Sequence, residues 1–321
     1  MAGLSLSARV IDELSGAAAG PTLIAVGGVH GNEPAGVAAA RNVLARVRAS
    51  GAALIGDVVA LAGNLRALAA GRRYLVRDLN RQWTDERIEA ARAAASDHAD
   101  REAADPEAIE AAELAAELER VMARARGPVF ALDLHTTSAD GIPFGVVGED
   151  EAHRAFAGAF PLPGIVGLES QLAGVLTGYL SRRGCVTLAV EGGQNQSPHA
   201  LANLEAAVTL GLAAAGVLSP GDVPGHGAAR ELLARARGDL PHLIEVVSRH
   251  EVRPGDGFRM EPGFANIQRA AAGTLLARDG RGEIRAPFDG LVLLPLYQAQ
   301  GSDGFFYGRE PGEGGAGRGE G

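Results

Sequence analysis

The chain has 321 residues and a formal net charge of −9, and this acidic balance argues against nucleic acid or an anionic membrane as its main partner. Its hydrophobic content of 46% is enough for a core of normal size in a globular protein. All 30 basic residues are arginines, which excludes lysine chemistry such as Schiff bases, P-loop phosphate binding and lipoyl or biotinyl attachment.

No segment of the sequence predicts export or membrane insertion. The first residues lack the basic and apolar regions of a signal peptide, and no apolar stretch reaches the roughly 18 residues of a membrane span. Cys185 is the only cysteine, so an internal disulfide is excluded. We therefore expect a cytoplasmic protein without a membrane partner.

Short apolar runs that end in glycine or a polar residue recur through the first two-thirds of the chain and predict buried strands. These runs are continuously apolar and do not alternate with polar residues, which is typical of a sheet covered on both faces. The predicted strands are residues 22–26, 58–62, 129–134 and 186–190.

Stretches rich in Ala and Leu lie between these runs and predict helices. Residues 35–50 begin after a proline, which suits a first helical turn, and residues 201–218 predict a later helix. Residues 84–126 predict two helices broken near Asp105, with their charges on a solvated face and no chemistry. Alternating strands and helices predict an α/β fold, with a mixed, mostly parallel sheet flanked by helices.

The composition changes after residue 218. A Gly- and Pro-rich linker is expected at 219–228, which would end a catalytic domain of residues 1–218. Short runs punctuated by Gly and Pro then predict a smaller β-rich domain at 229–308. The tail at 309–321 is almost free of apolar residues and is expected to be disordered.

Histidine and carboxylate side chains follow two of the predicted strands, where sites form in open α/β sheets. His30 and Glu33 lie in a Gly-rich loop after the first strand, and His135 ends the third, with Asp133 placed to orient it. Imidazole nitrogens and carboxylate oxygens are normal zinc ligands, and three of them leave a coordination position open for catalysis. Taken singly, each histidine also fits an ordinary surface or strand-end position without a metal.

Glu191 ends the fourth predicted strand and is followed by two glycines. A carboxylate at the end of an apolar strand is costly to desolvate without a purpose. We therefore hypothesise that Glu191 is a general base for a metal-bound water and then an acid to the leaving nitrogen. The alternative is a glutamate that pairs with a nearby arginine.

An arginine-rich segment, residues 72–81, carries groups that suit anion binding. Asn80 and Arg81 could hold a substrate carboxylate, because the planar guanidinium fork matches carboxylate geometry. Arg73 could stabilise an oxyanion. The alternative is a basic loop in a network of salt bridges.

These motifs stand in the order known from one enzyme family. They are His30-x-x-Glu33, Arg73, Asp78-Leu-Asn80-Arg81, Asp133-x-His135 and Glu191-x-Gly193. Together they resemble the aspartoacylase/succinylglutamate desuccinylase family of carboxypeptidase-like zinc hydrolases. The resemblance spans roughly residues 22–197, and residues 286–290 are similar to part of the small β domain of that family.

The resemblance implies a zinc-carboxypeptidase-like fold with one zinc ion per subunit. It also implies a role for each matching side chain. The implied zinc ligands are His30, Glu33 and His135, the catalytic residues Glu191 and Arg73, and the substrate-binding residues Asn80, Arg81, Arg182 and Tyr297. Arg183 competes with Arg182 for its role, and Tyr307 is a weaker candidate than Tyr297.

The implied function is zinc-dependent hydrolysis of the amide bond of a small N-acyl amino acid, with that small molecule as partner and a homo-oligomer left open. A zinc carboxypeptidase or peptide amidase, and a catalytically silent binding module of the same fold, are the alternatives. A serine hydrolase is disfavoured because no Gly-x-Ser-x-Gly motif occurs. The sequence does not identify the acyl group or the amino acid, and ligand type only favours zinc over other divalent ions.

Overall fold

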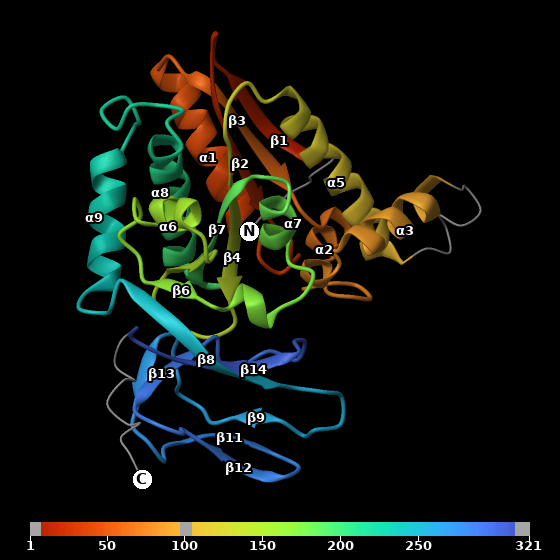
Figure 1. Cartoon of the computed structure of the whole chain (residues 1–321), viewed down its shortest axis with the longest axis vertical. Helices are drawn as coiled ribbons and strands as arrows, with labels where there is room; N and C mark the ends of the chain where they lie inside the picture. The colour runs from red at the N-terminus through yellow and green to blue at the C-terminus, as the bar shows by residue number, and fades with distance from the viewer. Residues whose placement is uncertain (1–7, 97–104, 312–321) are drawn as a thin grey trace.

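The computed structural model describes residues 8–96 and 105–311 of the chain. Strands form its centre and supply the regular elements at its C-terminal end (Figure 1). In chain order they are β1 (Val10–Ser15), β2 (Ala18–Gly27), β3 (Ile55–Ala62), β4 (Val129–Thr137), β5 (Phe144–Val147), β6 (Gly164–Val166), β7 (Val186–Gln194), β8 (Leu243–Glu251), β9 (Arg259–Met260), β10 (Gln268–Ala270), β11 (Leu275–Asp279), β12 (Gly282–Arg285), β13 (Gly290–Leu293) and β14 (Asp303–Arg309).

Eleven of these strands form one sheet, in the order β1-β3-β2-β4-β7-β5-β6-β8-β14-β13-β10. Its central pairs, from β3 through β2 and β4 to β7, are parallel, as are β5 with β6 and β6 with β8. The C-terminal strands pair antiparallel, and β12-β11-β9 form a second, three-stranded sheet. The predicted α/β class, with a mixed and mostly parallel sheet and a C-terminal β-rich part, is confirmed.

Helices cover both faces of the parallel part of the sheet, with α1, α8 and α9 on one side and α5 and α7 on the other (Figure 1). The α-helices are α1 (Ala35–Ser50), α2 (Leu65–Ala70), α3 (Asp85–Ser96), α5 (Pro106–Arg124), α6 (Glu151–Ala157), α7 (Leu176–Ser181), α8 (Pro198–Ala214) and α9 (His226–Arg237). Short 3₁₀ helices are η1 (Leu79–Arg81) and η2 (Glu169–Gln171).

Strand β2 shows why a continuous apolar run was the right signal. Successive side chains of a strand point to opposite faces of the sheet. Leu23 and Ala25 belong to the core cluster under α1 and α8, whereas Ile24 and Val26 belong to the cluster under α5 and α7. All four are fully buried, so both faces of this strand need apolar residues.

The predicted strands at 22–26, 58–62, 129–134 and 186–190 lie inside β2, β3, β4 and β7, and α1 matches the helix predicted at 35–50. The stretch at 84–126 contains α3 and α5, and the Asp105 side chain caps α5 by accepting a hydrogen bond from the Glu107 amide. The expectation that all its charges are solvated is wrong. Glu107 and Glu110 are buried, with exposures of 0% and 1%.

The C-terminal third contains one helix that the sequence analysis missed. Helix α9 begins inside the stretch expected to be a linker, and its Ala229 and Leu233 are buried against the α8 side of the core. Within the region predicted to be β-rich, the apolar residues at 243–247, 274–277 and 291–296 fall in or overlap β8, β11 and β13, and β8 joins the main sheet beside β6. The domain boundaries stay predictions. Arg309 ends β14, and residues 312–321 of the expected tail lie outside the described residues.

Among the residues described, none of the helices combines the length and the apolar character that crossing a membrane requires.

Candidate metal centre and active site

The loop after β2 is shaped by glycines that admit a sharp turn against α2. Gly28 has a φ of 72°, a conformation that favours glycine. A Cβ atom on Gly31 would lie 2.0 Å from the backbone of Ala67 in α2, so this position also excludes a side chain. The tight turn directs His30 and Glu33 toward the carboxyl end of β4.

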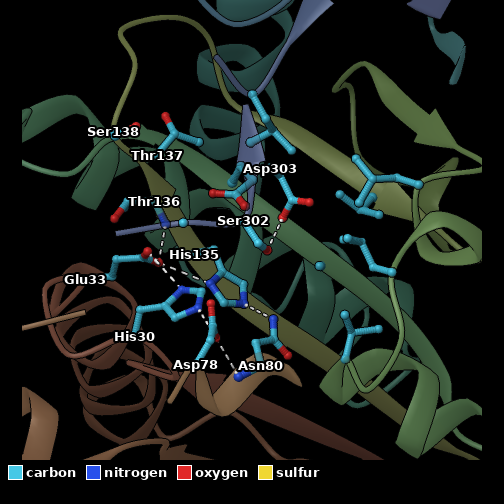
Figure 2. A pocket seen from close by; sticks show the side chains of 18 of the residues that line it. His30, Glu33, Asp78, Asn80, His135, Thr136, Thr137, Ser138, Ser302 and Asp303 are labelled. Carbon is cyan, nitrogen blue, oxygen red and sulfur yellow. Dashed lines mark hydrogen bonds and ion pairs between the residues drawn. The ribbon is translucent and has the colours of Figure 1, made fainter. Parts of the chain in front are cut away.

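His30, Glu33 and His135 meet at this place, and one ligand atom from each lies within 4.8 Å of the others (Figure 2). The Glu33 carboxylate lies between the rings, with Oε1 3.0 Å from His30 Nδ1 and Oε2 3.1 Å from His135 Nδ1. The Thr136 amide donates a further hydrogen bond to Oε2. All three side chains are buried, so the donors face one another and not bulk water.

The other nitrogen of each histidine meets a second carboxylate. His30 Nε2 lies 3.0 Å from Asp78 Oδ1, and His135 Nε2 lies 3.0 Å from Asp133 Oδ2. A metal-binding histidine generally gives its second ring nitrogen to a carboxylate or carbonyl, which fixes its orientation and strengthens it as a ligand. The donor set and its outer carboxylates therefore fit a bound divalent cation.

The electrostatics of the cluster of His30, Glu33 and His135 also favour a positive charge at this place. Burial would lower the pKa of the His135 imidazole, but the carboxylates of Asp133 and Glu33 outweigh it and raise this pKa well above its ordinary value. Burial would raise the pKa of the Glu33 carboxyl, but the two histidines lower it. A metal ion at this place would take over the charge that a proton supplies, and its binding would release that proton.

Glu191 lies next to this group because of the register between two parallel strands. Residue 191 in β7 is the direct partner of His135 in β4, so both side chains leave the sheet side by side. Glu191 Oε2 is buried and has no hydrogen-bond partner. Burial raises the pKa of this carboxyl from 4.5 to about 7, while the nearby positive charges of His135, His30 and Arg73 oppose the shift.

Arg73 reaches the same group from the segment that follows α2. Its Nη1 and Nη2 donate to Glu33 Oε1 at 3.3 Å and Asp78 Oδ2 at 3.2 Å, and its buried Nε has no partner. The Oδ1 atom of Asn80 accepts a hydrogen bond from the Leu176 amide. The Nδ2 atom of Asn80 lies 3.4 Å from His135 Nε2. Arg73 and Asn80 therefore lie beside the candidate metal centre.

Arg81 is held from the C-terminal part of the chain. Its Nη2 donates to Asp303 Oδ2 at 2.7 Å, and its Nη1 donates to the carbonyl oxygen of Asn80. Asp303 also accepts from Arg249. A substrate carboxylate that binds Arg81 would therefore share the guanidinium group with Asp303 or displace the Asp303 carboxylate from it.

A cavity of about 140 Å³ connects these side chains, which is room for a small molecule. One wall comes from the candidate metal centre and Glu191, and another from the segment that leads from β13 into β14, including Leu296, Ser302 and Asp303. Ser302 and Asp303 are drawn with the two histidines in Figure 2. The cavity therefore joins residues that are far apart in the sequence.

A family model for the succinylglutamate desuccinylase/aspartoacylase catalytic domain matches residues 19–213. The chain belongs to the succinylglutamate desuccinylase/aspartoacylase family. The family resemblance predicted from the motifs is thereby confirmed, and membership makes the chain a deacylase-type hydrolase that acts on amide bonds.

Solved structures of this family share the fold. A succinylglutamate desuccinylase/aspartoacylase from Rhodobacter sphaeroides aligns with a TM-score of 0.65 and 19% identity, over 92% of this chain and 88% of the other. The product-bound ectoine utilization protein EutE (DoeB) from Ruegeria pomeroyi gives 0.62 and 21%, over 92% and 87%. Succinylglutamate desuccinylase from Vibrio cholerae gives 0.62 and 16%, over 92% and 84%. No curated protein sequence matches significantly.

Two residues expected to bind substrate in this family member do not line the cavity. Arg182 is exposed and donates to the Trp83 carbonyl oxygen, and its neighbour Arg183 is held by Asp85 and stacks over Tyr179. These arginines follow α7 and are tied to the start of α3, which keeps both guanidinium groups outside.

Neither tyrosine reaches the cavity. Tyr297 is 39% exposed, and its hydroxyl donates to the Glu261 carbonyl oxygen and accepts from the Phe264 amide. Tyr307 is fully buried in the C-terminal β region, where its hydroxyl is held by backbone carbonyls. In this structure the segment containing Tyr297 contributes its neighbours to the cavity but not the ring itself.

Sequence reasoning also missed two carboxylates of the cavity wall, Asp303 and Glu169. Burial raises the pKa of the Glu169 carboxyl, and its Oε1 has no partner. Neither residue stands in a motif that marks a site. Asp303 is recognisable only through its contacts with two arginines that are distant in sequence.

Proposed function

We propose that this chain is a zinc-dependent hydrolase that cleaves the amide bond of a small N-acyl amino acid. The observation that carries the proposal is the buried group of His30, Glu33 and His135 beside the unpartnered carboxylate of Glu191. Two imidazoles and one carboxylate match a catalytic zinc site, which leaves one position open. A cytoplasmic location remains an expectation, and assembly into a homo-oligomer is left open.

His30, Glu33 and His135 would hold the zinc ion. When bound, zinc supplies Lewis acidity, which lowers the pKa of water and polarises a carbonyl oxygen. Asp78 and Asp133 keep the two imidazoles oriented through their second ring nitrogens. Zinc is favoured over softer or harder ions because of this nitrogen and oxygen donor set.

Glu191 would move the protons of the reaction. Its unpartnered carboxylate accepts a proton from the attacking water and then donates it to the leaving amine nitrogen. Arg73 would stabilise the negative charge that develops on the carbonyl oxygen, because its buried Nε can donate one more hydrogen bond. Both groups lie in the wall of the same cavity.

Asn80 and Arg81 would bind the carboxylate of the amino acid and so place the scissile bond near Glu191. Arg81 is the stronger anchor, since its charged guanidinium lies in the cavity wall. A zinc carboxypeptidase or peptide amidase is a less favoured alternative, because the family is one of deacylases.

The direct test is hydrolysis of a panel of N-acetyl, N-succinyl and N-formyl amino acids, with short peptides for comparison. Release of free amine from at least one acyl amino acid is expected, and a chelator should abolish it until zinc is restored. Preferential cleavage of the peptides would favour the peptidase alternative. No chelator-sensitive release from any compound would refute the proposed activity.

Replacing Arg81 with Gln is expected to raise KM about 10-fold or more, with a smaller change in kcat. The substitution removes charge-assisted hydrogen bonds to the substrate carboxylate. It therefore weakens binding of the substrate in the ground state and in the transition state alike. Steady-state kinetics on the best acyl amino acid measures this effect. Arg249→Gln is the matched control, because Arg249 also contacts Asp303 but does not line the cavity. Equal increases in KM for the two variants would show that the effect arises from a lost contact with Asp303 and not from lost substrate binding by Arg81.

The rate is expected to fall on the acid side as Glu191 takes up a proton, because only the ionised carboxylate accepts a proton from water. Burial raises its pKa from 4.5 to about 7, and a bound cation would shift it back down. The acid limb of kcat/KM should therefore fall between pH 4.5 and 7. A flat profile over this range, with the protein folded by circular dichroism, would argue against Glu191 as the base.

A further inference from the structure

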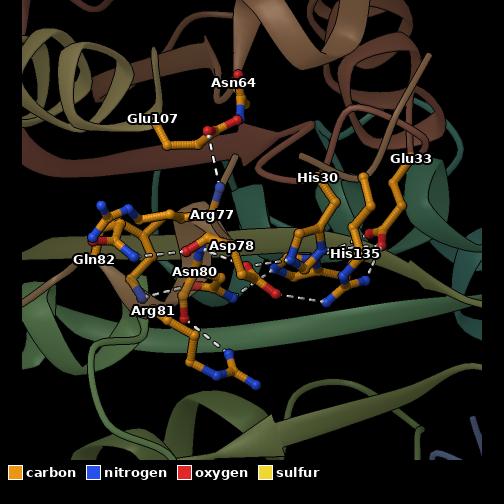
Figure 3. Close-up of polar contacts among 12 residues, drawn as sticks. His30, Glu33, Asn64, Arg77, Asp78, Asn80, Arg81, Gln82, Glu107 and His135 are labelled. Carbon is orange, nitrogen blue, oxygen red and sulfur yellow. Dashed lines mark hydrogen bonds and ion pairs between the residues drawn. The ribbon is translucent and has the colours of Figure 1, made fainter. Parts of the chain in front are cut away.

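Glu107, in the first turn of α5, binds the backbone of the segment that leads into the site (Figure 3). Its Oε1 accepts from the Leu75 amide at 2.7 Å, and its Oε2 accepts from the amides of Val76 at 3.0 Å and Arg77 at 3.2 Å. The Asn64 side chain donates a fourth hydrogen bond, to Oε1. Successive amides that converge in this way form a cradle for an anion.

The charge of Glu107 is well supported although the residue is fully buried. Burial would raise the pKa of this carboxyl, but the three amides and Asn64 outweigh it and lower the pKa. The amino end of a helix also favours a negative charge. The carboxylate is therefore ionised and holds four donors at once.

Apart from Glu107, the held segment is fixed by an ion pair between the Arg77 guanidinium and Asp105 at the start of α5. Val76 is 57% exposed, the Leu75 side chain is only partly buried, and the Arg77 side chain is 65% exposed. Side-chain packing therefore contributes little at 75–77. The hydrogen bonds to Glu107 act directly on the backbone of all three residues, whereas the Arg77–Asp105 ion pair acts through a side chain.

This segment ends at a residue of the metal centre. Asp78 follows Arg77 directly, and its carboxylate contacts both His30 Nε2 and Arg73 Nη2 (Figure 3). A shift of the backbone at residues 75–77 would thus change the position of the carboxylate that orients one metal-binding histidine and one catalytic arginine.

We propose that Glu107 is a positioning residue that sets the place of Asp78, and through it the orientation of His30 and Arg73. The inference rests on the proposed function for the roles of His30 and Arg73. Glu107 lies in α5, within the stretch at 84–126 for whose charges the sequence predicted no chemical role. A glutamine here would turn an NH₂ group toward backbone N–H donors, because both carboxylate oxygens accept hydrogen bonds from amides.

The test compares Glu107→Gln with Glu110→Gln in the full chain. Glu110 lies one turn further along α5 and is equally buried, but it holds the amides of Leu65 and Arg66 at the start of α2. Three quantities are measured: amide hydrogen exchange at Leu75 to Arg77, zinc affinity by competition with a chelator, and the unfolding temperature.

Glu107→Gln is expected to speed exchange at residues 75–77 and to weaken zinc binding about 10-fold, as loss of support for a metal ligand does. Glu110→Gln should lower the unfolding temperature without either effect. If Glu107→Gln fails to fold, Glu107→Asp keeps the charge but withdraws the oxygens, and it should show the same pattern to a smaller degree.

Unchanged exchange at 75–77, or equal loss of zinc affinity in both variants, would overturn the positioning role. These readouts do not require turnover, so they stand apart from the substrate assay. Native zinc binding without hydrolysis of any acyl amino acid would reject the proposed activity and leave this inference intact. If the native enzyme is active but Glu107→Gln binds zinc with native affinity, the proposed activity stands and the positioning role of Glu107 is rejected.

Discussion

Replacing Glu191 with Gln is expected to lower kcat by about 10²–10⁴-fold, with the metal content and the unfolding temperature close to those of the native protein. Glutamine keeps the shape of the side chain but cannot accept a proton from water. Because Glu191 Oε2 has no partner, little native hydrogen bonding is lost in the exchange. The measurement is steady-state kinetics on the best acyl amino acid, with zinc determined in the same preparation.

The matched control is Glu169→Gln, which neutralises a second carboxylate in the wall of the same cavity. Glu169 is contributed by η2 and lies outside the metal group. Its loss is expected to act on KM more than on kcat. Comparable losses of kcat in both variants would show that cavity charge, and not proton transfer by Glu191, limits the reaction.

Removal of the metal is expected to abolish turnover, and His135→Ala should do so permanently. The substitution deletes one of the three proposed ligands and leaves the Asp133 carboxylate without its histidine. Native protein stripped by a chelator should regain activity with zinc. Zinc should also raise its unfolding temperature, since a ligand at about 1,000 times its Kd stabilises by about 4 kcal/mol. His135→Ala should show no zinc-dependent shift.

His153→Ala serves as the control for losing a buried histidine. His153 is 5% exposed and contacts Asp150 and Ser181, and it does not belong to the metal group. This variant should unfold at a lower temperature yet keep the shift on adding zinc. Zinc stabilisation that survives in His135→Ala would place the metal elsewhere and remove the basis of the proposed activity.

Local signals in the sequence predicted the elements that build the centre of the molecule. The largely apolar runs at 22–26 and 129–134 became β2 and β4 because each strand is covered by helices on both sides and needs apolar residues on both of its faces. His30 follows β2 and His135 lies near the carboxyl end of β4, and parallel neighbours end at the same edge of a sheet. The meeting of the two histidines was therefore predictable.

Side chains placed by long-range packing were not predictable in this way. Arg182 and Tyr297 were assigned through resemblance, but each binds a backbone carbonyl that is distant in sequence, of Trp83 and Glu261, and lies outside the cavity. Asp303 enters the wall because β14 pairs with β8 and carries it toward Arg81. No local pattern encodes that approach.

The sequence by itself determined the α/β class, the family, and the order of the candidate histidine and carboxylate ligands along the chain, because apolar periodicity and short motifs are local properties. Only the tertiary structure decided which charges are buried and which face the cavity. Glu107 and Glu191 show the difference: both are glutamates beside apolar residues, but one is held by four donors and the other has a free oxygen next to His135. Burial and partners arise from elements that are distant in sequence, and these set the charge and reactivity of each carboxylate.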